Sequence, residues 1–554
     1  MSLHPHPIPA IPDETARVAK AALPQGALCL RLRDELGVIF ADEDFVDLYP
    51  AVGQPAAAPW RLTLVIILQS LEDLSDRQAA HAVRSRIDWK YLLGLDLTDA
   101  GFDWSILSEF RARLVAGHAE MRLLETVLVA CEQRGWLKAR GRQRTDSTHV
   151  LTAARALNRL ELVVETLRAA LNVLATAAPD WLAGKVPGDW FDRYAQRADD
   201  YHFPKSKEAR AALGEQIGRD GYQVLAWIAG VDDAPLRETV AALTALATLR
   251  AVWEQQFIHE GEGVRWRTGA ELAPSGERID TPYDPDARYS TKRSTTWTGY
   301  KVHLTETCDE ETPHLITDVT TTLATVPDVM ETGPIEKALV VRKLPPSQHI
   351  VDSGYVSAEE LVKSRQCAID LVGPIRADGA WQAQGNHDNH AYALAAFEIQ
   401  WEQQQARCPQ GKVSRQWKPT HTPVGKPTIH VEFDPADCTP CPVRMQCTHA
   451  KRDPRELTLR PQAQDEAMRQ LRLRQRTPAF KDLYAQRAGI EGTLSQGLRL
   501  TGLRHARYRG FAKVHLQHSI AAVALNLVRI DTWLAGVPLA HTRTSPFARL
   551  KSAA

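Results

Sequence analysis

Apolar residues recur at helical spacing in three long stretches of this chain. The first covers residues 55–135 and contains "WRLTLVIILQSLEDLSDRQAAHAV", the second covers about 155–260, and the third covers 462–530. In each stretch apolar side chains return every three or four positions with few Gly or Pro residues between them, which is the pattern of a helix with one buried face. The pattern therefore predicts three helical regions.

The stretches between these regions are rich in Thr, Val, Tyr and Trp, which favour strands. A strand is predicted in "RTDSTHVLTA", which begins at Arg144, and further strands are predicted near 299–304, near 313–325 and in "QHIVDSGY", which ends at Tyr355. Helical "SAEELVKSR" and strand-like "CAIDLVGPI" follow. Strands that alternate with helices predict an α/β sheet domain.

The pattern divides the chain into six segments. They are an extended leader (1–54), a helical N-terminal domain (55–135), the first part of an α/β core (140–375) with a helical insertion at about 155–260, a polar, Pro-rich, Cys-containing insertion (376–455), a C-terminal helical part (456–535) and a tail (536–554).

Composition and charge narrow the class of protein only a little. The 554 residues suffice for about two to four domains. The 67 Lys and Arg residues equal the 67 Asp and Glu residues, which excludes a uniformly basic protein but leaves local DNA-binding patches open. The N-terminal residues lack a signal-peptide pattern, and no apolar run approaches the roughly 20 residues of a membrane-spanning helix. We therefore expect a cytoplasmic protein without membrane contact and with reduced cysteines.

One local excess of positive charge lies between Lys451 and Lys513, where 15 Lys and Arg residues stand against 6 Asp and Glu residues. This density suits a track of phosphate contacts on DNA. A solvated helix face is the alternative.

Four cysteines form a cluster late in the chain. Cys438, Cys441 and Cys447 follow Cys408, and the Cys-x2-Cys spacing is the usual half-site of a structural zinc ion. We therefore predict a zinc knuckle with these four ligands, and reduced thiols without metal are the alternative. The other cysteines have no metal-ligand spacing and are predicted to be buried apolar residues: Cys29, Cys131, Cys308 and Cys367.

Three acidic residues stand out by their context. Asp146 lies within a predicted strand, Asp352 ends another, and Glu491 lies in "YAQRAGIEGTLSQG" at a helix start among Arg and Lys residues. Tyr484, Arg487 and Glu491 are spaced i, i+3 and i+7, which places them on one helix face. Taken alone, a carboxylate beside Arg is usually a surface ion pair.

The segment "YAQRAGIEGTLSQG" resembles the Tyr-x2-Arg-x3-Glu signature of bacterial insertion-sequence transposases of the DDE class, and the chain is most similar to the IS1182 group of IS5/IS4-like transposases. "GYKVHLTETC", "IVDSGY" and the Cys cluster resemble the same family in the same order. The resemblance implies a ribonuclease H-like mixed sheet, with Asp146 on its first strand, Asp352 on its fourth and Glu491 on a later helix.

The resemblance also implies an activity and its partners. Asp146, Asp352 and Glu491 would be catalytic and would hold two Mg²⁺ (or Mn²⁺) ions, because hard divalent cations prefer carboxylate oxygens and two such ions can cleave a phosphodiester. The partners would be double-stranded DNA, at the inverted-repeat ends and at the target, and a second copy of the chain in a homodimer on DNA. The protein would associate with the bacterial nucleoid, and the N-terminal helical domain would bind DNA or dimerise.

Eight residues are expected to contact DNA: Tyr484, Arg487, Arg499, Arg504, Arg507, Arg509, Lys301 and His303. The family signature continues with Lys seven residues after Glu, but Leu498 stands there and Arg499 follows it. Lys301 and His303 alternate on one face of a predicted strand, so both side chains point toward the site or, alternatively, line an exposed face.

Two other functions stay open from the sequence. One is a ribonuclease H-like nuclease without strand transfer, which inverted repeats around the coding region would argue against. The other is an inactive, domesticated DNA-binding derivative, which the intact Asp146, Asp352 and Glu491 argue against.

Overall fold

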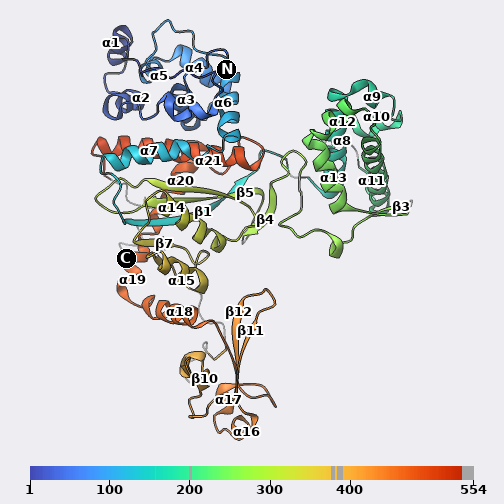
Figure 1. Cartoon of the computed structure of the whole chain (residues 1–554), viewed down its shortest axis with the longest axis vertical. Helices are drawn as coiled ribbons and strands as arrows, with labels where there is room; N and C mark the ends of the chain where they lie inside the picture. The colour runs from blue at the N-terminus through green and yellow to red at the C-terminus, as the bar shows by residue number, and fades with distance from the viewer. Residues whose placement is uncertain are drawn as a thin grey trace, which may run out of the picture.

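A mixed sheet lies at the centre of the molecule, with helices on both of its faces (Figure 1). The computed structural model describes residues 1–155, 157–198, 203–261, 263–292, 294–375, 381–382 and 391–538, so most of the predicted tail lies outside the described residues. The N-terminal helices, the helical insertion and the Cys-containing part extend from the sheet in three directions (Figure 1).

The central sheet has β1 as its middle strand. Its six strands are β1 (Arg142–Leu151), β4 (Arg288–Lys292), β5 (Thr295–Thr307), β6 (Ile316–Leu323), β7 (Gln348–Val351) and β8 (Asp370–Val372). β1 pairs antiparallel with β5 and parallel with β7, β8 is parallel to β7, and β4 and β6 both pair antiparallel with β5. β5 and β6 lie where strands were predicted near 299–304 and 313–325, and the α/β class is confirmed.

Helices cover both faces of this sheet. They are the short 3-10 helix η5 (Asp328–Glu331), α14 (Thr332–Val341), α15 (Ala358–Gln366), α18 (Gln462–Arg474), α19 (Pro478–Ala485), α20 (Ala488–Thr501) and α21 (Phe511–Leu534). On one face Val302 and Leu304 share a core with Ile490 of α20 and Leu525 of α21. On the other face Ile350 shares a separate core with residues of α14, α15, α18 and α19. α21 is apolar almost all round, since the N-terminal helices pack on its outer side.

The N-terminal part is helical from its beginning. Its elements are α1 (Asp13–Ala22), α2 (Leu28–Arg31), the π-helix η1 (Leu32–Leu36), the 3-10 helix η2 (Asp42–Leu48), α3 (Pro59–Leu71), α4 (Asp76–Ser85), α5 (Ile87–Leu93), α6 (Ser105–Ala116) and α7 (Arg122–Gln133). α3 to α7 lie in the region predicted to be helical. The sequence predicted an extended leader over 1–54, but α1 and α2 lie there, because Leu30, Phe40 and Phe45 are buried in the same core as α21.

The helical insertion forms a unit with its own core. It contains α8 (Arg159–Ala177), α9 (Pro179–Ala183), α10 (Asp189–Tyr194), α11 (Lys207–Ala229), α12 (Ala234–Ala241), α13 (Thr244–Gln256), β2 (Phe257–Glu260), β3 (Gly263–Trp266) and the 3-10 helix η4 (Gly269–Glu271). Trp190 and Trp253 lie in this core, which is separate from the cores at the sheet. The insertion begins and ends beside the sheet, because Thr152, just after β1, donates a hydrogen bond to Asp284, just before β4.

The Cys-rich module, as we name residues 391–459, forms a smaller unit with the core residues Phe397, Val431 and Phe433. It contains the 3-10 helix η6 (Leu394–Ala396), β9 (Glu398–Gln400), β10 (Gln405–Arg407), β11 (Gln416–His421), β12 (Pro427–Glu432), α16 (Pro435–Cys438), α17 (Arg444–Cys447) and β13 (Glu456–Leu459). β11, β12 and β13 form an antiparallel sheet in that order.

One buried carboxylate joins the sheet to the helices on one of its faces. Glu306 of β5 accepts hydrogen bonds from Arg144 Nε at 2.7 Å, from Arg529 Nη1 at 2.7 Å and from the Thr493 hydroxyl at 2.5 Å. Burial raises the pKa of Glu306, but the two guanidinium groups outweigh this effect and hold the pKa below its ordinary value. The carboxylate is therefore ionised and fixes α20 and α21 against β1 and β5.

We expect Glu306→Gln to lower the free energy of unfolding by about 3–5 kcal/mol, because Arg144 and Arg529 would be left as buried cations without their counter-charge. Thermal denaturation measures the change. Glu311→Gln is the matched control, since Glu311 is 81% exposed and its pair with Lys138 contributes no more than about 1 kcal/mol. Equal melting temperatures for the two variants would contradict this role of Glu306.

Candidate active site

Asp146 and Asp352 lie side by side on neighbouring parallel strands. Thr145 of β1 pairs with Val351, the last residue of β7, so the next residue along each strand is one of the two aspartates. Asp146 is buried, and one of its oxygens accepts the Ser147 N–H at 2.8 Å. Asp352 follows the end of its strand in a turn, where it accepts the Gly354 N–H at 2.7 Å. The two carboxylates therefore meet where β7 ends against the middle of β1.

Glu491 reaches the same place from the first turn of α20. Arg487, the residue before that helix, donates to Asp146 at 2.8 Å through Nη2 and to Glu491 at 2.8 Å through Nη1. The Glu491 side chain is 64% exposed, whereas that of Asp146 is 11% exposed. Arg487 thus links a buried carboxylate, Asp146, to an exposed one, Glu491.

Tyr484 lies beside the same groups. Burial raises the pKa of its hydroxyl, Arg487 opposes the increase, and the charges of Asp352, Asp146 and Glu491 add to it, so all three carboxylates act on this side chain. The sequence predicted one continuous helix through Tyr484, Arg487 and Glu491. In the structure α19 ends at Ala485 and α20 begins at Ala488, yet the turn keeps right-handed backbone angles and leaves the three side chains together.

The pKa of Asp146 is raised by its buried position and by a neighbouring negative charge. Burial raises its pKa to about 6; Arg487 opposes this shift, and the charge of Asp352 adds to it. A cation between Asp146 and Asp352 would relieve both the burial cost and the repulsion.

The donor set suits Mg²⁺ or Mn²⁺, because three carboxylates supply only hard oxygen ligands. As arranged, no three His, Cys, Asp or Glu side chains in the described part of the chain are grouped closely enough to hold a metal ion. Arg487 explains part of this arrangement, since it occupies oxygens of both Asp146 and Glu491.

Two buried residues, His303 and Tyr355, pack beneath the surface at the turn that carries Asp352. The Tyr355 hydroxyl and His303 Nδ1 are hydrogen-bonded at 2.6 Å, and Thr332 donates to the Tyr355 carbonyl at 2.8 Å. Burial lowers the pKa of His303 to about 4, so its ring is neutral at pH 7. Neither His303 nor Tyr355 is exposed, and the DNA contact expected for His303 is not available to this buried side chain.

Lys301 is also buried, and its ammonium group is bonded within the protein. Its ammonium group lies 2.5 Å from Asp328 and also bonds the Val326 carbonyl, so the exposed strand face considered for Lys301 and His303 is absent. Lys292 approaches Asp328 at 3.4 Å and is 56% exposed. Burial raises the pKa of Asp328, but the two lysines outweigh it and bring the pKa below its ordinary value. Sequence reasoning missed Asp328 and Lys292, because neither lies in a motif.

The arginines predicted to bind DNA differ in their surroundings. Arg499 is exposed on α20, and Arg504 donates to the Thr148 hydroxyl at 2.8 Å, on the same strand as Asp146. Arg507 joins the N-terminal helices through Asp73 and the Leu74 carbonyl. Arg509 is exposed, and its guanidinium stacks on Tyr283. Arg504 is therefore hydrogen-bonded to the strand that carries Asp146, whereas Arg507 holds the N-terminal helices against the C-terminal part of the chain.

The four clustered cysteines surround one cavity of about 370 Å³ in the Cys-rich module: Cys408, Cys438, Cys441 and Cys447. Burial raises the pKa of Cys447 to about 11, and the other three cysteines contribute to the rise, so all four lie within mutual electrostatic range. Among the remaining cysteines, Cys29, Cys131 and Cys308 are buried as predicted. The prediction is wrong for Cys367, which is exposed because it follows the end of α15.

Two segments of the chain match known protein families. Residues 407–531 match a family described as a transposase DDE domain, and residues 17–113 match a transposase domain (DUF772). These matches support a DDE transposase. The first match includes Glu491 and the clustered cysteines, and the second covers most of the N-terminal helices. The chain matches no curated protein and no solved structure.

None of the described helices combines the length and the apolar character that crossing a bilayer requires.

We expect Asp146→Asn to stabilise the metal-free protein at about pH 8 by up to about 3 kcal/mol, because a pKa raised from 3.8 to about 6 penalises the charged form in the folded state. The penalty is absent below about pH 4, grows as the pH rises toward 6 and is complete above it. Thermal denaturation in EDTA at about pH 8 and about pH 4.5 measures the gain, which should be smaller at the lower pH.

Asp232→Asn is the control for this experiment, since Asp232 is an exposed residue of the helical insertion. A gain that is equal at both pH values, or one that the control reproduces, would contradict the assigned cause.

Proposed function

We propose that this protein is the transposase of a bacterial insertion sequence related to the IS1182 group. It binds the terminal inverted repeats of its element and catalyses metal-dependent cleavage and strand transfer of DNA in the cytoplasm. The observation that carries the proposal is the proximity of three carboxylates: Arg487 bonds both Asp146 and Glu491, and Asp352 lies beside Asp146 on the neighbouring strand. The two transposase family matches support it independently of these side chains.

The topology of the sheet supports a ribonuclease H-like core. β6, β5 and β1 are antiparallel neighbours, and β7 and β8 continue from β1 in parallel. The first aspartate lies on the first strand of this set, the second follows the fourth strand, and the glutamate lies on a helix over β1. On this reading the helical unit between β1 and β4 and the Cys-rich module between β8 and α18 are insertions into the core.

In this proposal Asp146, Asp352 and Glu491 hold two Mg²⁺ or Mn²⁺ ions, which would supply an activated nucleophile and stabilise the charge of the reacting phosphate. Asp146 and Asp352 are placed by two adjacent strands, so their spacing is rigid. Arg487 exchanges its carboxylate partners for a phosphate oxygen when DNA binds. Its Nε is buried and has no partner among the described residues, so this atom would gain a hydrogen bond if the guanidinium turned toward a bound phosphate.

The proposed partners are duplex DNA at the element ends and at the target, with a homodimer as the active form. Exposed Arg499 and Arg509, together with Arg504, are the proposed phosphate contacts near the site. Tyr484 lies among the three carboxylates, where it would contact DNA close to the reacting bond.

We expect Asp352→Asn to abolish excision of a marked element from a plasmid that carries the gene's own flanking DNA, while DNA binding and the melting temperature are kept. Loss of one carboxylate removes a metal ligand and leaves the turn intact. Glu359→Gln is the matched control, because Glu359 is half-exposed on nearby α15 and should excise as the wild type does.

Excision by the Asp352→Asn variant would show that Asp352 is not catalytic. The products separate the alternatives: 3′ ends joined to target DNA support a transposase, whereas cleaved ends without joining support a nuclease. DNA-dependent function that survives loss of all three carboxylates would support a domesticated binding protein.

We also propose that Cys408, Cys438, Cys441 and Cys447 hold a structural zinc ion. Four thiolates around one zinc ion carry a net charge of about −2, which needs compensation in a partly buried site. Arg444 and Arg455 line the same cavity, and each has a buried nitrogen without a hydrogen-bond partner among the described residues. These cations suit an anionic zinc–thiolate group better than four neutral thiols.

We expect about one zinc ion per purified wild-type chain and almost none in the Cys438→Ser/Cys441→Ser double variant, because each removed thiolate takes away one of four ligands. Elemental analysis of the full chain measures the stoichiometry. Cys367→Ser should keep its zinc, since Cys367 is exposed and outside the cavity. Wild-type protein with well under one zinc ion per chain would remove the proposal.

A further inference from the structure

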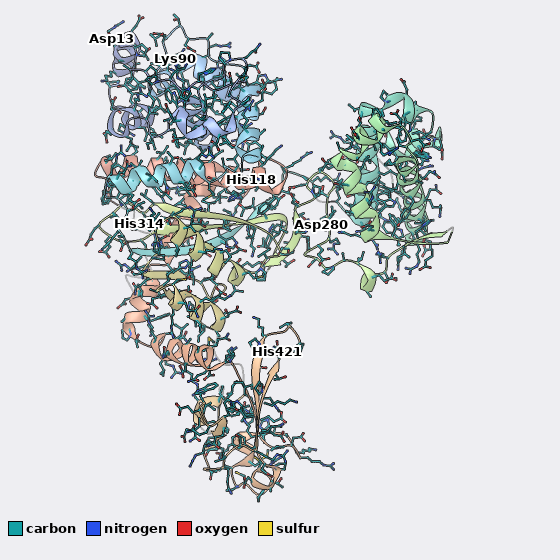
Figure 2. All side chains as sticks on the ribbon, in the orientation of Figure 1. Asp13, Lys90, His118, Asp280, His314 and His421 are labelled. Carbon is teal, nitrogen blue, oxygen red and sulfur yellow. The ribbon has the colours of Figure 1, made fainter. Side chains whose placement is uncertain are left out.

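The ribbon formed by β11 and β12 extends beyond the strand that supports it. β13 pairs only with Ile429–Glu432 of β12, so residues 420–428 form a two-stranded hairpin with no third strand beside it in the described part of the chain. The hairpin rises from the Cys-rich module toward the level of the central sheet, and His421 lies on this outer part (Figure 2). A hairpin that projects in this way contributes little to its own module's core.

The charge of this ribbon has one sign. From Gln403 to Val431 the chain has five Lys and Arg residues and no Asp or Glu, in a protein of zero net charge. Three of the five pair with carboxylates outside that stretch: Arg407 with Glu398, Lys412 with Asp437 and Arg415 with Glu432. Lys426 lies in the outer hairpin and Lys418 lies two residues before it on β11; both are exposed and have no ion pair among the described residues.

The outer end of the ribbon lies beside the element that follows Asp352. Lys363 mainly, and Lys426 to a smaller extent, lower the pKa of the Glu359 carboxyl, so Lys426 is near the first turn of α15. α15 begins shortly after the Asp352 turn. Lys426 therefore lies near the element that follows the Asp352 turn.

We propose that the β11–β12 hairpin is an arm that binds the sugar-phosphate backbone of duplex DNA beside the active site. This inference rests on the proposed function, which supplies DNA as the partner. Strands of six residues span roughly 20 Å, and a two-stranded ribbon fits the major groove, which is about 12 Å wide. Lys418 and Lys426 contact phosphates on this arm, which therefore contributes affinity without sequence preference.

A different role for the same residues is protection of a sheet edge. Lys and Pro on an exposed strand prevent it from pairing with another chain, and Pro419, Pro423 and Pro427 suit that role. This role requires no DNA and no particular direction of the hairpin. The position of Lys426 next to α15 favours the DNA arm, and the two roles give different results in a binding experiment.

The experiment measures binding of full-length protein to a fluorescein-labelled random-sequence duplex of about 40 base pairs, at KCl concentrations from about 50 to 300 mM. In the Lys418→Ala/Lys426→Ala variant we expect the slope of log Kd against log salt to fall by about 2 and Kd to rise about tenfold at physiological salt, because two phosphate contacts are lost. Lys205→Ala/Lys207→Ala is the matched control, which removes the same charge from exposed positions in the helical insertion and should bind as the wild type does.

Lysine acetylation adds a readout that needs no variant. Mass spectrometry should find Lys418 and Lys426 protected from an acetylating reagent when the duplex is present, with Lys205 and Lys207 unprotected. Both double variants change exposed residues only, so their melting temperatures should equal that of the wild type.

Four outcomes would contradict the proposal that the hairpin binds DNA. Wild-type binding with unchanged slope and Kd in the Lys418→Ala/Lys426→Ala variant removes it and leaves the proposed function standing. An equal loss of DNA affinity in the Lys205→Ala/Lys207→Ala control would show that total charge, and not the position of the lysines, determines the affinity. Self-association of the hairpin variant with unchanged DNA affinity assigns the lysines to edge protection. Failure of the wild type to bind any duplex removes the proposed function and the arm together.

Discussion

The arrangement of the central sheet and the helices on one of its faces depends on one fully buried carboxylate. Glu306 is shared by Arg144, Arg529 and Thr493, which come from β1, α21 and α20. A buried charge without its partners is costly, so few arrangements of these elements satisfy all four side chains. Arg144 also donates to the Gln486 carbonyl in the turn before α20, and a Cβ on Gly489 would lie 2.1 Å from its guanidinium. The start of α20, and with it Glu491, is thereby positioned over Asp146.

Around the three carboxylates the structure sets a cation against nearly every anion. Arg487 stands between Asp146 and Glu491, and Lys301 and Lys292 stand beside Asp328. An acidic site without such cations would repel the phosphates of the proposed DNA partner. The neighbouring cations reduce this repulsion, and only Glu491 of the three carboxylates is widely exposed.

The sequence was most informative where local pattern decides structure. Alternating strands and helices predicted β1, β5, β6 and β7, and context and resemblance singled out Asp146, Asp352 and Glu491, which the fold brings together. The pairing of Lys301 with Asp328 and of His303 with Tyr355 depends on which loops close over β5, and periodicity holds no information on that. The leader was misjudged, because the Pro and His residues at its start precede apolar residues that are buried in a core shared with the other N-terminal helices and with α21, far along the chain.

Because of the order of these elements along the chain, the three carboxylates can come together only when translation of the chain is nearly complete. β1 emerges early, but the helical insertion separates it from β5, and the Cys-rich module delays α20 and α21 further. A chain that stops short of α20 holds Asp146 and Asp352 without Glu491, and without Arg529 the carboxylate of Glu306 lacks one of its two counter-ions. Prematurely terminated translation products are therefore unable to bring the three carboxylates together, so under the proposed function only a chain synthesised to its last helices would cleave DNA.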